Sequence, residues 1–236
     1  MRSFETEFPP ARQTPSSRTA EADRSEGPER IRILVVDDHP AVRWGVVQLL
    51  EDQPDFEVAA VATDAEMAVV QAEREPFDVA VLDYHLGGRN GLWVTRCLES
   101  LRTPPRTVIF SAFANDHLAA NCAVAGADAL LSKGSLGDEL CHAIRSVAHG
   151  RRMVPRVSAT MAEELRARLD GEQRTILGML LAGVAAERIA ETLAITLSEL
   201  SDRRTAMLAR LEPLPGERAP RTRDQSPSDL ERLVPR

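Results

Sequence analysis

The chain has 236 residues, 43% of them hydrophobic, and a formal net charge of −7 at pH 7. This length allows one or two domains with a sizeable core, and the negative charge argues against a protein that binds nucleic acid over its whole surface. Because no apolar run approaches the ~18 residues of a membrane span and residues 1–30 lack an apolar signal-peptide core, we expect a cytoplasmic protein without membrane contact.

Most of the chain alternates between strand-like and helical patterns. Residues 1–30 are polar, contain several prolines and serines, and are predicted to be disordered. Ile31–Val36 is a short apolar run followed by acids, which is typical of a buried parallel strand, and a helical pattern follows it. Further strand-like runs lie at 57–62, 78–82, 106–110 and 127–131, with helical patterns at 64–75, 90–102, 115–124 and 136–149. This alternation over 31–150 predicts an α/β domain of the flavodoxin type, with a doubly wound five-stranded parallel sheet.

The alternation stops near Gly150. Residues 151–165 begin with a basic, proline-containing stretch and are predicted to be a linker. Three shorter helical patterns without a strand between them occupy 166–213, which predicts a small all-α helix-turn-helix domain. Residues 214–236 are rich in proline and arginine and are predicted to be disordered, ending in what resembles the remnant of a cleavable tag.

Capping residues mark the helices expected in 166–213. Asp170 is placed to begin the first helix as its N-cap, and Gly183 is placed to end it. Thr196 is the predicted N-cap of the last helix, with Glu199 three residues on as its partner in a capping box.

Polar residues stand where the predicted strands end. Asp37 and Asp38 follow the first strand, Asp83 the third, Ser111 the fourth and Lys133 the fifth. Ligands of open α/β sheets bind at the carboxyl ends of the strands, so we expect these residues to converge. Three carboxylates in one crevice repel each other unless a cation lies among them, and their hard oxygen atoms suit Mg²⁺ as the cofactor.

This group of residues suits the transfer of a phosphoryl group to Asp83. The cation would screen the anionic carboxylate from the anionic donor. Lys133 would add a second positive charge, and the Ser111 hydroxyl would donate a hydrogen bond to the phosphoryl group. Lys133 is also the single lysine among the 29 lysines and arginines of the chain, which indicates that an ammonium is needed there.

In this order the residues resemble the receiver domain of bacterial two-component response regulators. The motifs that carry the resemblance are Val35-Val-Asp-Asp-His-Pro40, Asp83-Tyr-His-Leu-Gly-Gly-Arg-Asn-Gly91, Ser111-Ala112 and Gly126-Ala-Asp-Ala-Leu-Leu-Ser-Lys133. The resemblance covers 31–150 and implies phosphorylation of Asp83 by a sensor histidine kinase. It also implies a regulator rather than an enzyme, with Mg²⁺ bound by Asp37, Asp38, Asp83 and the backbone carbonyl of His85.

One position departs from the receiver pattern. Receivers commonly carry Tyr or Phe three residues before the lysine, and its ring reorients when the hydroxyl residue moves toward the phosphate. Leu130 stands at this position, so the switch residues expected here are Ser111 and Leu130. Because leucine has no planar ring to reorient, we expect phosphorylation and output to be coupled weakly or by another route.

Residues 166–213 resemble the LuxR-type helix-turn-helix domain of NarL/FixJ-type regulators, which implies DNA binding and control of transcription. We expect the recognition helix to contact promoter DNA through two serines and three arginines: Ser198, Ser201, Arg203, Arg204 and Arg210. Seven arginines and seven acids cancel over 166–213, and the acids Glu199 and Asp202 lie on the recognition helix. DNA binding should therefore be weak, and a homodimer, which doubles the phosphate contacts, is the expected binding form.

Two other functions remain open from the residues alone. The C-terminal domain could bind a protein partner instead of DNA, which Glu199, Asp202 and the zero net charge would favour. An aspartyl-nucleophile phosphatase has a similar sheet, but it normally carries a D-x-D motif where this chain has Asp37-Asp38-His39. His39 and His85 raise the possibility of zinc, and the lack of a second pair at ligand spacing argues against metal-binding histidines.

Overall fold

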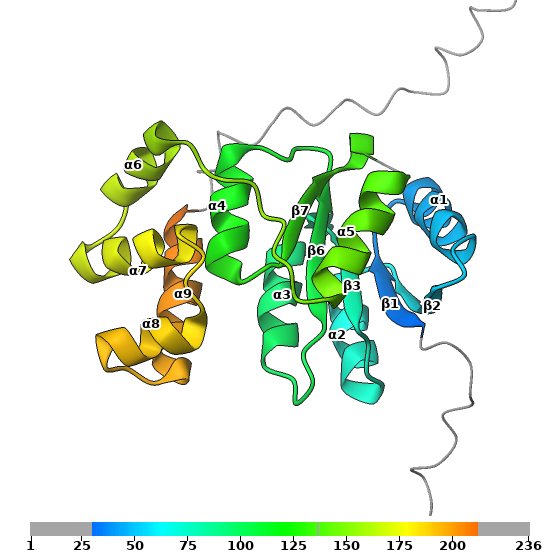
Figure 1. Cartoon of the computed structure of the whole chain (residues 1–236), viewed down its shortest axis with the longest axis horizontal. Helices are drawn as coiled ribbons and strands as arrows, with labels where there is room; N and C mark the ends of the chain where they lie inside the picture. The colour runs from blue at the N-terminus through cyan, green and yellow to red at the C-terminus, as the bar shows by residue number, and fades with distance from the viewer. Residues whose placement is uncertain (1–29, 136, 212–236) are drawn as a thin grey trace, which may run out of the picture.

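The computed structural model describes residues 30–135 and 137–211, and its centre is a five-stranded parallel sheet (Figure 1). The strands are β1 (Ile31–Val36), β2 (Phe56–Ala62), β3 (Val79–Asp83), β6 (Arg106–Ser111) and β7 (Ala129–Ser132). They lie in the order β2-β1-β3-β6-β7, and every neighbouring pair is parallel. The predicted doubly wound α/β fold is confirmed.

Helices cover both faces of the sheet. One face carries α1 (Pro40–Glu51) and α5 (Asp138–Ala148), and the other carries α2 (Ala65–Arg74), α3 (Gly91–Glu99) and α4 (Asp116–Ala125). Successive strand residues point to opposite faces, so Leu34 packs on the α2–α4 side and Val35 on the α1–α5 side. Both faces are buried, which explains why the strands are almost continuously apolar.

A short hairpin separates β3 from α3, and the sequence pattern did not predict it. Its strands are β4 (His85–Leu86) and β5 (Arg89–Asn90). Gly87 has a φ of 77°, a conformation that favours glycine and lets the chain reverse in so few residues. Asn90 then caps α3, because its side chain accepts a hydrogen bond from the Trp93 backbone N–H.

The C-terminal part is all-α, as predicted. Its helices are α6 (Ala159–Ala167), α7 (Gly171–Leu181), α8 (Ala186–Leu193) and α9 (Leu197–Leu211). Asp170 caps α7, Gly183 has a φ of 76° beyond its end, and Thr196 and Glu199 form the reciprocal capping box of α9.

The segment predicted as a linker, 151–165, contains the start of α6. Ser158 caps this helix by accepting a hydrogen bond from the Met161 backbone N–H. Leu165, also within the predicted linker, is 1% exposed in the core that the C-terminal helices form with α4. The helix was missed because one buried leucine in nine residues gives little periodicity.

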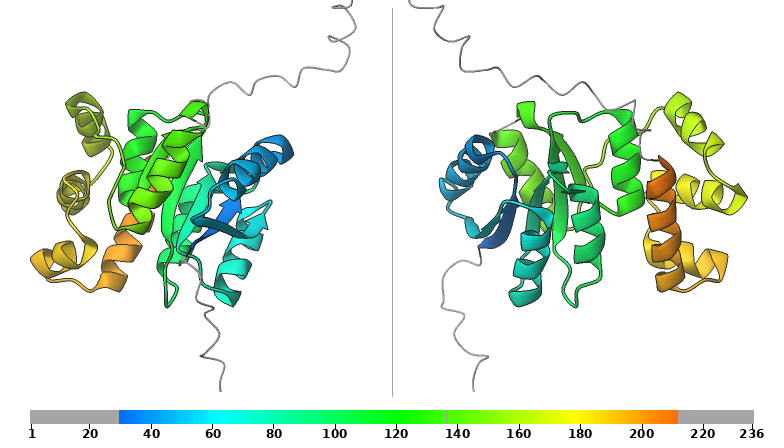
Figure 2. Two further views of the ribbon diagram at one scale, coloured as in Figure 1. Left: turned by 45° about the vertical axis from the view of Figure 1, so that its right-hand side comes forward. Right: turned by 180° about the vertical axis from the view of Figure 1, so that it is seen from behind.

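Helix α4 lies between the sheet and the C-terminal helices (Figure 2). Every residue from Leu118 to Ala125 is buried. Leu118 and Cys122 pack in the core over the sheet, whereas Ala120 and Val124 join the core formed by α6–α9. A helix that is apolar all round is expected where both sides are covered, and α4 fits that pattern.

Two segments predicted to be disordered, 1–30 and 214–236, lie outside the described residues except for Arg30. Within the part that is described, no helix has the length and apolar character that crossing a membrane requires.

Replacing Gly91 by alanine should destabilise the fold. A Cβ at this position would overlap the backbone carbonyl oxygen of Asp83, which cannot move without shifting the end of β3. We expect Gly91→Ala to lower the free energy of unfolding by about 2–3 kcal/mol. Gly88→Ala is the matched control, because a Cβ there meets nothing within 4 Å. Equal urea midpoints for the two variants would contradict this close approach.

Candidate functional site

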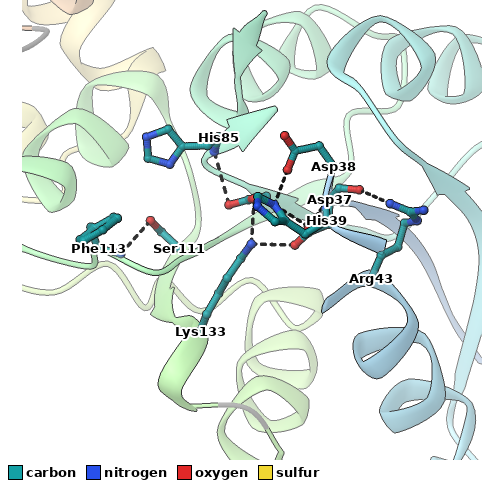
Figure 3. Close-up of polar contacts among 9 residues, drawn as sticks. Asp37, Asp38, His39, Arg43, His85, Ser111, Phe113 and Lys133 are labelled. Atoms are coloured by element: carbon teal, nitrogen blue, oxygen red, sulfur yellow. Dashed lines mark hydrogen bonds and ion pairs between the residues drawn. The ribbon is translucent and has the colours of Figure 1, made fainter. Parts of the chain in front are cut away.

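The polar residues at the strand ends converge, as the sequence predicted (Figure 3). Asp37 follows β1 directly, Asp83 is the last residue of β3, Ser111 is the last of β6, and Lys133 follows β7. Asp37 and Asp83 are 3% and 4% exposed, and Ser111 is fully buried. Four chain segments thus deliver one compact group of charged and polar side chains, with Asp38 at its rim.

Lys133 bridges the two buried carboxylates. Its Nζ lies 2.8 Å from Asp37 Oδ2 and 2.8 Å from Asp83 Oδ2. Burial tends to lower the pKa of the Lys133 ammonium, but the hydrogen bonds to both carboxylates outweigh it and leave that pKa raised. Lys133 is therefore held charged between two anions that could not otherwise be buried so close together.

Burial dominates the electrostatics of Asp83. It raises the pKa of this carboxyl group, while the hydrogen bond and charge of Lys133 oppose the increase. The backbone N–H of His85 donates to the other carboxylate oxygen, Asp83 Oδ1, over 3.3 Å. One oxygen thus faces the ammonium and the other faces the hairpin, so the carboxylate is fixed in orientation.

The acidic group has the composition of a cation site. Oxygens of Asp37, Asp38 and Asp83 and a ring nitrogen of His39 all lie within 4.8 Å of one another. Lys133 contacts two of the three carboxylates, and among the described residues Asp38 has an ion-pair partner only in His39. Negative charge therefore exceeds positive charge at the carboxylates, and their hard oxygens fit Mg²⁺.

Ser111 and Leu130, the predicted switch residues, lie in different surroundings. The Ser111 hydroxyl oxygen accepts a hydrogen bond from the Phe113 backbone N–H over 3.1 Å, at the edge of the acidic group. The Phe113 ring is half exposed and meets the His85 ring edge-on, with 6.4 Å between their centroids. Leu130 is 3% exposed and packs in the core beneath α4.

Several of the residues expected to contact DNA are paired within the protein itself. Arg204 is 3% exposed: its Nε donates to the Val124 carbonyl oxygen over 2.7 Å, and Nη1 lies 2.6 Å from Glu99 Oε1. Arg96 on α3 donates to both the carbonyl and the hydroxyl oxygen of Ser201. Helix α9 is therefore fastened to α3 and α4 through two arginines.

The other two arginines of α9 are paired with α7. Arg203 lies 3.2 Å from Glu172, and Arg210 lies 3.0 Å from Asp170. Of the five residues expected to meet DNA, Ser198 and Arg210 are exposed, Ser201 and Arg203 are partly buried, and Arg204 is buried. The acids Glu199 and Asp202 are exposed on the same helix.

The burial of Arg204 is explained by the residues that surround it on α3 and α4. The last carbonyls of α4, such as that of Val124, have no partner within the helix itself, and they attract a guanidinium. Gly126 has no side chain, and a Cβ there would overlap the Arg204 guanidinium. Arg96 and Glu99 on α3 also contact α9, through Ser201 and Arg204. The sequence did not indicate a role for either residue, because the partner of each lies 105 positions away.

Comparisons with known proteins show which family the chain resembles. Residues 33–145 match the model of the response regulator receiver domain. "Probable transcriptional regulatory protein NarL" of Mycobacterium tuberculosis is 31% identical over 174 residues, 70% of this chain and 81% of that protein. The "DNA-binding transcriptional activator DevR/DosR" of the same species is 29% identical over 77% of this chain and 88% of its own length.

Solved structures of response regulators have a similar fold. A two-component response regulator of the LuxR family from Aurantimonas sp. is 35% identical, with a TM-score of 0.52 over 58% of this chain and 98% of that one. RcsB from Salmonella enterica serovar Typhimurium, solved bound to a promoter, has a TM-score of 0.51 over 78% of this chain and 92% of its own. Its identity of 16% makes it a relative in fold alone.

Removing the Lys133 charge should make stability depend strongly on pH. In Lys133→Met, Asp37 and Asp83 face each other without the ammonium, so we expect about 3 kcal/mol less unfolding free energy near neutral pH. The folded pKa of Asp83 then rises further above its unfolded value of about 3.9. The penalty is absent below that unfolded value and grows as pH rises through the folded pKa.

Urea unfolding from about pH 4 to about pH 8 measures this dependence. Asp83→Asn in the same background should restore most of the lost stability, because it removes one of the two facing charges. A loss that is the same at every pH, or that Asp83→Asn does not repair, would contradict the bridging role of Lys133.

Proposed function

Because the chain belongs to the NarL/FixJ-type response regulators, we propose that phosphorylation of Asp83 controls its activity as a regulator of transcription. The observation that carries the proposal is the convergence of Asp37, Asp83 and Lys133, with Ser111, at one edge of the sheet. A buried nucleophilic carboxylate beside a fixed ammonium and a hydroxyl is the arrangement that phosphoryl transfer needs.

In the proposed reaction an oxygen of the Asp83 carboxylate attacks the phosphorus of a phosphohistidine on a sensor histidine kinase. A P–O bond forms as the P–N bond breaks, and its electrons go to the imidazole nitrogen, which takes up a proton. The Asp83 product is an acyl phosphate. Lys133, already 2.8 Å from one oxygen of Asp83, exchanges that contact for a phosphoryl oxygen, and the Ser111 hydroxyl donates to another.

Asp37, Asp38 and Asp83, with the backbone carbonyl of His85, are the residues that would hold Mg²⁺. When bound, the cation supplies positive charge between the carboxylate and the phosphoryl group. The surplus of carboxylates over Lys133 supports this assignment, because a pocket with only one ammonium leaves negative charge uncompensated. The backbone N–H of His85 donates to Asp83 and holds that carboxylate in a fixed orientation.

Promoter DNA is the proposed target of α8 and α9, which have the helix-turn-helix arrangement. Ser198, Ser201, Arg203, Arg204 and Arg210 remain the proposed contacts. Glu99 forms an ion pair with Arg204, as a DNA phosphate would. Helix α9 must therefore separate from α3 and α4 before Arg204 can contact DNA. A homodimer in the cytoplasm is the proposed working form.

Helix α4 is the proposed route from the phosphorylation site to α9. Ser111 ends β6 and contacts Phe113 in the loop that leads to α4, and the other end of α4 holds Arg204 through Val124. Any shift of Ser111 toward a phosphoryl group would move this loop, and α4 is packed on both sides. This route needs no aromatic ring at Leu130.

Phosphorylation should depend on Asp83 alone. With acetyl phosphate or phosphoramidate and Mg²⁺, intact-mass spectrometry should show one added phosphoryl group on wild type and none on Asp83→Asn. Asp52→Asn, which changes an exposed acid at the end of α1, is the matched control and should be labelled like wild type. Labelling of Asp83→Asn, or labelling that survives excess chelator, would refute the assignment.

Weakening the Arg204–Glu99 pair should release α9. We expect Glu99→Gln to raise the affinity of the unphosphorylated chain for promoter DNA by about 5- to 30-fold, equivalent to ~1–2 kcal/mol. Glu73→Gln removes the same charge from the exposed surface of α2 and controls for the change in net charge. Electrophoretic shift titrations at several salt concentrations make the comparison.

Equal gains for Glu99→Gln and Glu73→Gln would mean that the added affinity comes from net charge and not from release of α9. No binding by either variant, or by wild type with beryllofluoride, would turn the proposal toward a protein partner.

A further inference from the structure

His39 brings a nitrogen donor to the acidic group. Its Nδ1 lies 2.6 Å from Asp38 Oδ1, 3.7 Å from Asp37 Oδ1 and 4.0 Å from Asp83 Oδ2. Figure 3 shows the imidazole beside Asp37 and Asp38, above Lys133. His85, the other histidine near the site, has its ring against Tyr84 and Phe113, and that ring contributes no nitrogen to this group.

The backbone holds the His39 ring in this place. The His39 N–H donates to Asp37 Oδ1 over 2.8 Å. Pro40 follows, and the residue before a proline is restricted to extended conformations, which His39 adopts with φ −89° and ψ 111°. His39 is also the N-cap residue of α1, yet its side chain makes no capping hydrogen bond. The ring is thus directed toward the carboxylates instead of the helix end.

The His39 ring nitrogen and the Asp38 carboxylate are in direct contact. Nδ1 lies 2.6 Å from Asp38 Oδ1, an atom that is buried from solvent. A neutral imidazole nitrogen and a carboxylate oxygen both have lone pairs that a cation can accept, and Asp37 and Asp83 offer further oxygens within 4.8 Å. The ring and the three carboxylates thus form one set of donor atoms.

We propose that His39 Nδ1 is a metal ligand, and that with Asp37, Asp38 and Asp83 it gives the pocket a higher affinity for divalent transition metals such as Ni²⁺ and Zn²⁺ than for Mg²⁺. This inference rests on the cation site of the proposed function. Mg²⁺ prefers oxygen donors, whereas imidazole binds Ni²⁺ and Zn²⁺ well. One nitrogen among three carboxylates therefore shifts the preference of the pocket toward those ions.

The consequence is a second occupant for the phosphorylation pocket. An ion held by His39 and the three carboxylates would exclude Mg²⁺ from the same site. Ni²⁺ and Zn²⁺ would then compete with Mg²⁺, and the competition would be set by the imidazole. This effect is separate from the phosphoryl chemistry, so it can be measured by binding alone.

Isothermal titration calorimetry of the full chain with MgCl₂ and with NiCl₂ tests the proposal. We expect His39→Asn to weaken Ni²⁺ binding by at least ~10-fold and Mg²⁺ binding by less than ~3-fold. His142→Asn is the matched control, because it removes an exposed imidazole on α5 that lies outside this group, so it should leave both affinities unchanged. If His39→Asn does not fold, His39→Gln replaces it.

The outcomes separate this proposal from the one it rests on. If Asp83→Asn leaves Mg²⁺ binding intact, the proposed Mg²⁺ site is wrong and this inference falls with it. If Asp83→Asn abolishes Mg²⁺ binding while His39→Asn leaves Ni²⁺ binding at the wild-type affinity, the Mg²⁺ site stands and the role of His39 is overturned. Equal losses for both ions in His39→Asn would make His39 a residue that only orients Asp38.

Discussion

The ammonium of Lys133 between two buried carboxylates is the interaction on which the rest of the site depends. Asp37 and Asp83 come from neighbouring strands and are almost fully buried, which is a costly arrangement for two like charges. Lys133 arrives from the far side of β6 and contacts both. The doubly wound topology makes this possible, because it brings the carboxyl ends of β1, β3 and β7 to a single edge.

A second constraint is the double burial of α4. Its inner side closes the core over the sheet, and its outer side, with Ala120 and Val124, forms part of the core of the C-terminal helices. The two parts of the chain therefore share one helix. Small residues dominate it, so the C-terminal helices approach closely, and Arg204 reaches the backbone at its end. The proposed phosphorylation site lies near the start of α4, and Arg204 of α9 contacts the backbone near its end.

Local patterns predicted much of this structure and failed where distant segments meet. The strand ends with Asp37, Asp83, Ser111 and Lys133 were predictable, because strand periodicity and parallel topology together fix which residues share an edge. The capping of α7 and α9 followed from single residues. The environment of Arg204 was not predictable, because its partners lie on α3 and α4, far away in the sequence. The sequence pattern of a helix is the same whether its arginine faces solvent or a buried carbonyl. The place of His39 could not be predicted for a similar reason: besides its sequence neighbours Asp37 and Asp38, its ring lies near Asp83, which comes from another strand.

The fit of Arg204 beside Gly126 limits how freely the two parts of this protein can be recombined. The Arg204 guanidinium occupies the volume that a side chain at position 126 would fill. A last helix grafted from another regulator must therefore carry an arginine at the position of Arg204, or a cavity remains beside Gly126. A larger residue at 126 would in turn clash with Arg204 and displace α9. The C-terminal helices and the sheet domain are therefore complementary at Arg204 and Gly126. A chimaera that changes only one of these two residues would lose the packing of α9 on α4, even if every proposed contact to DNA were preserved.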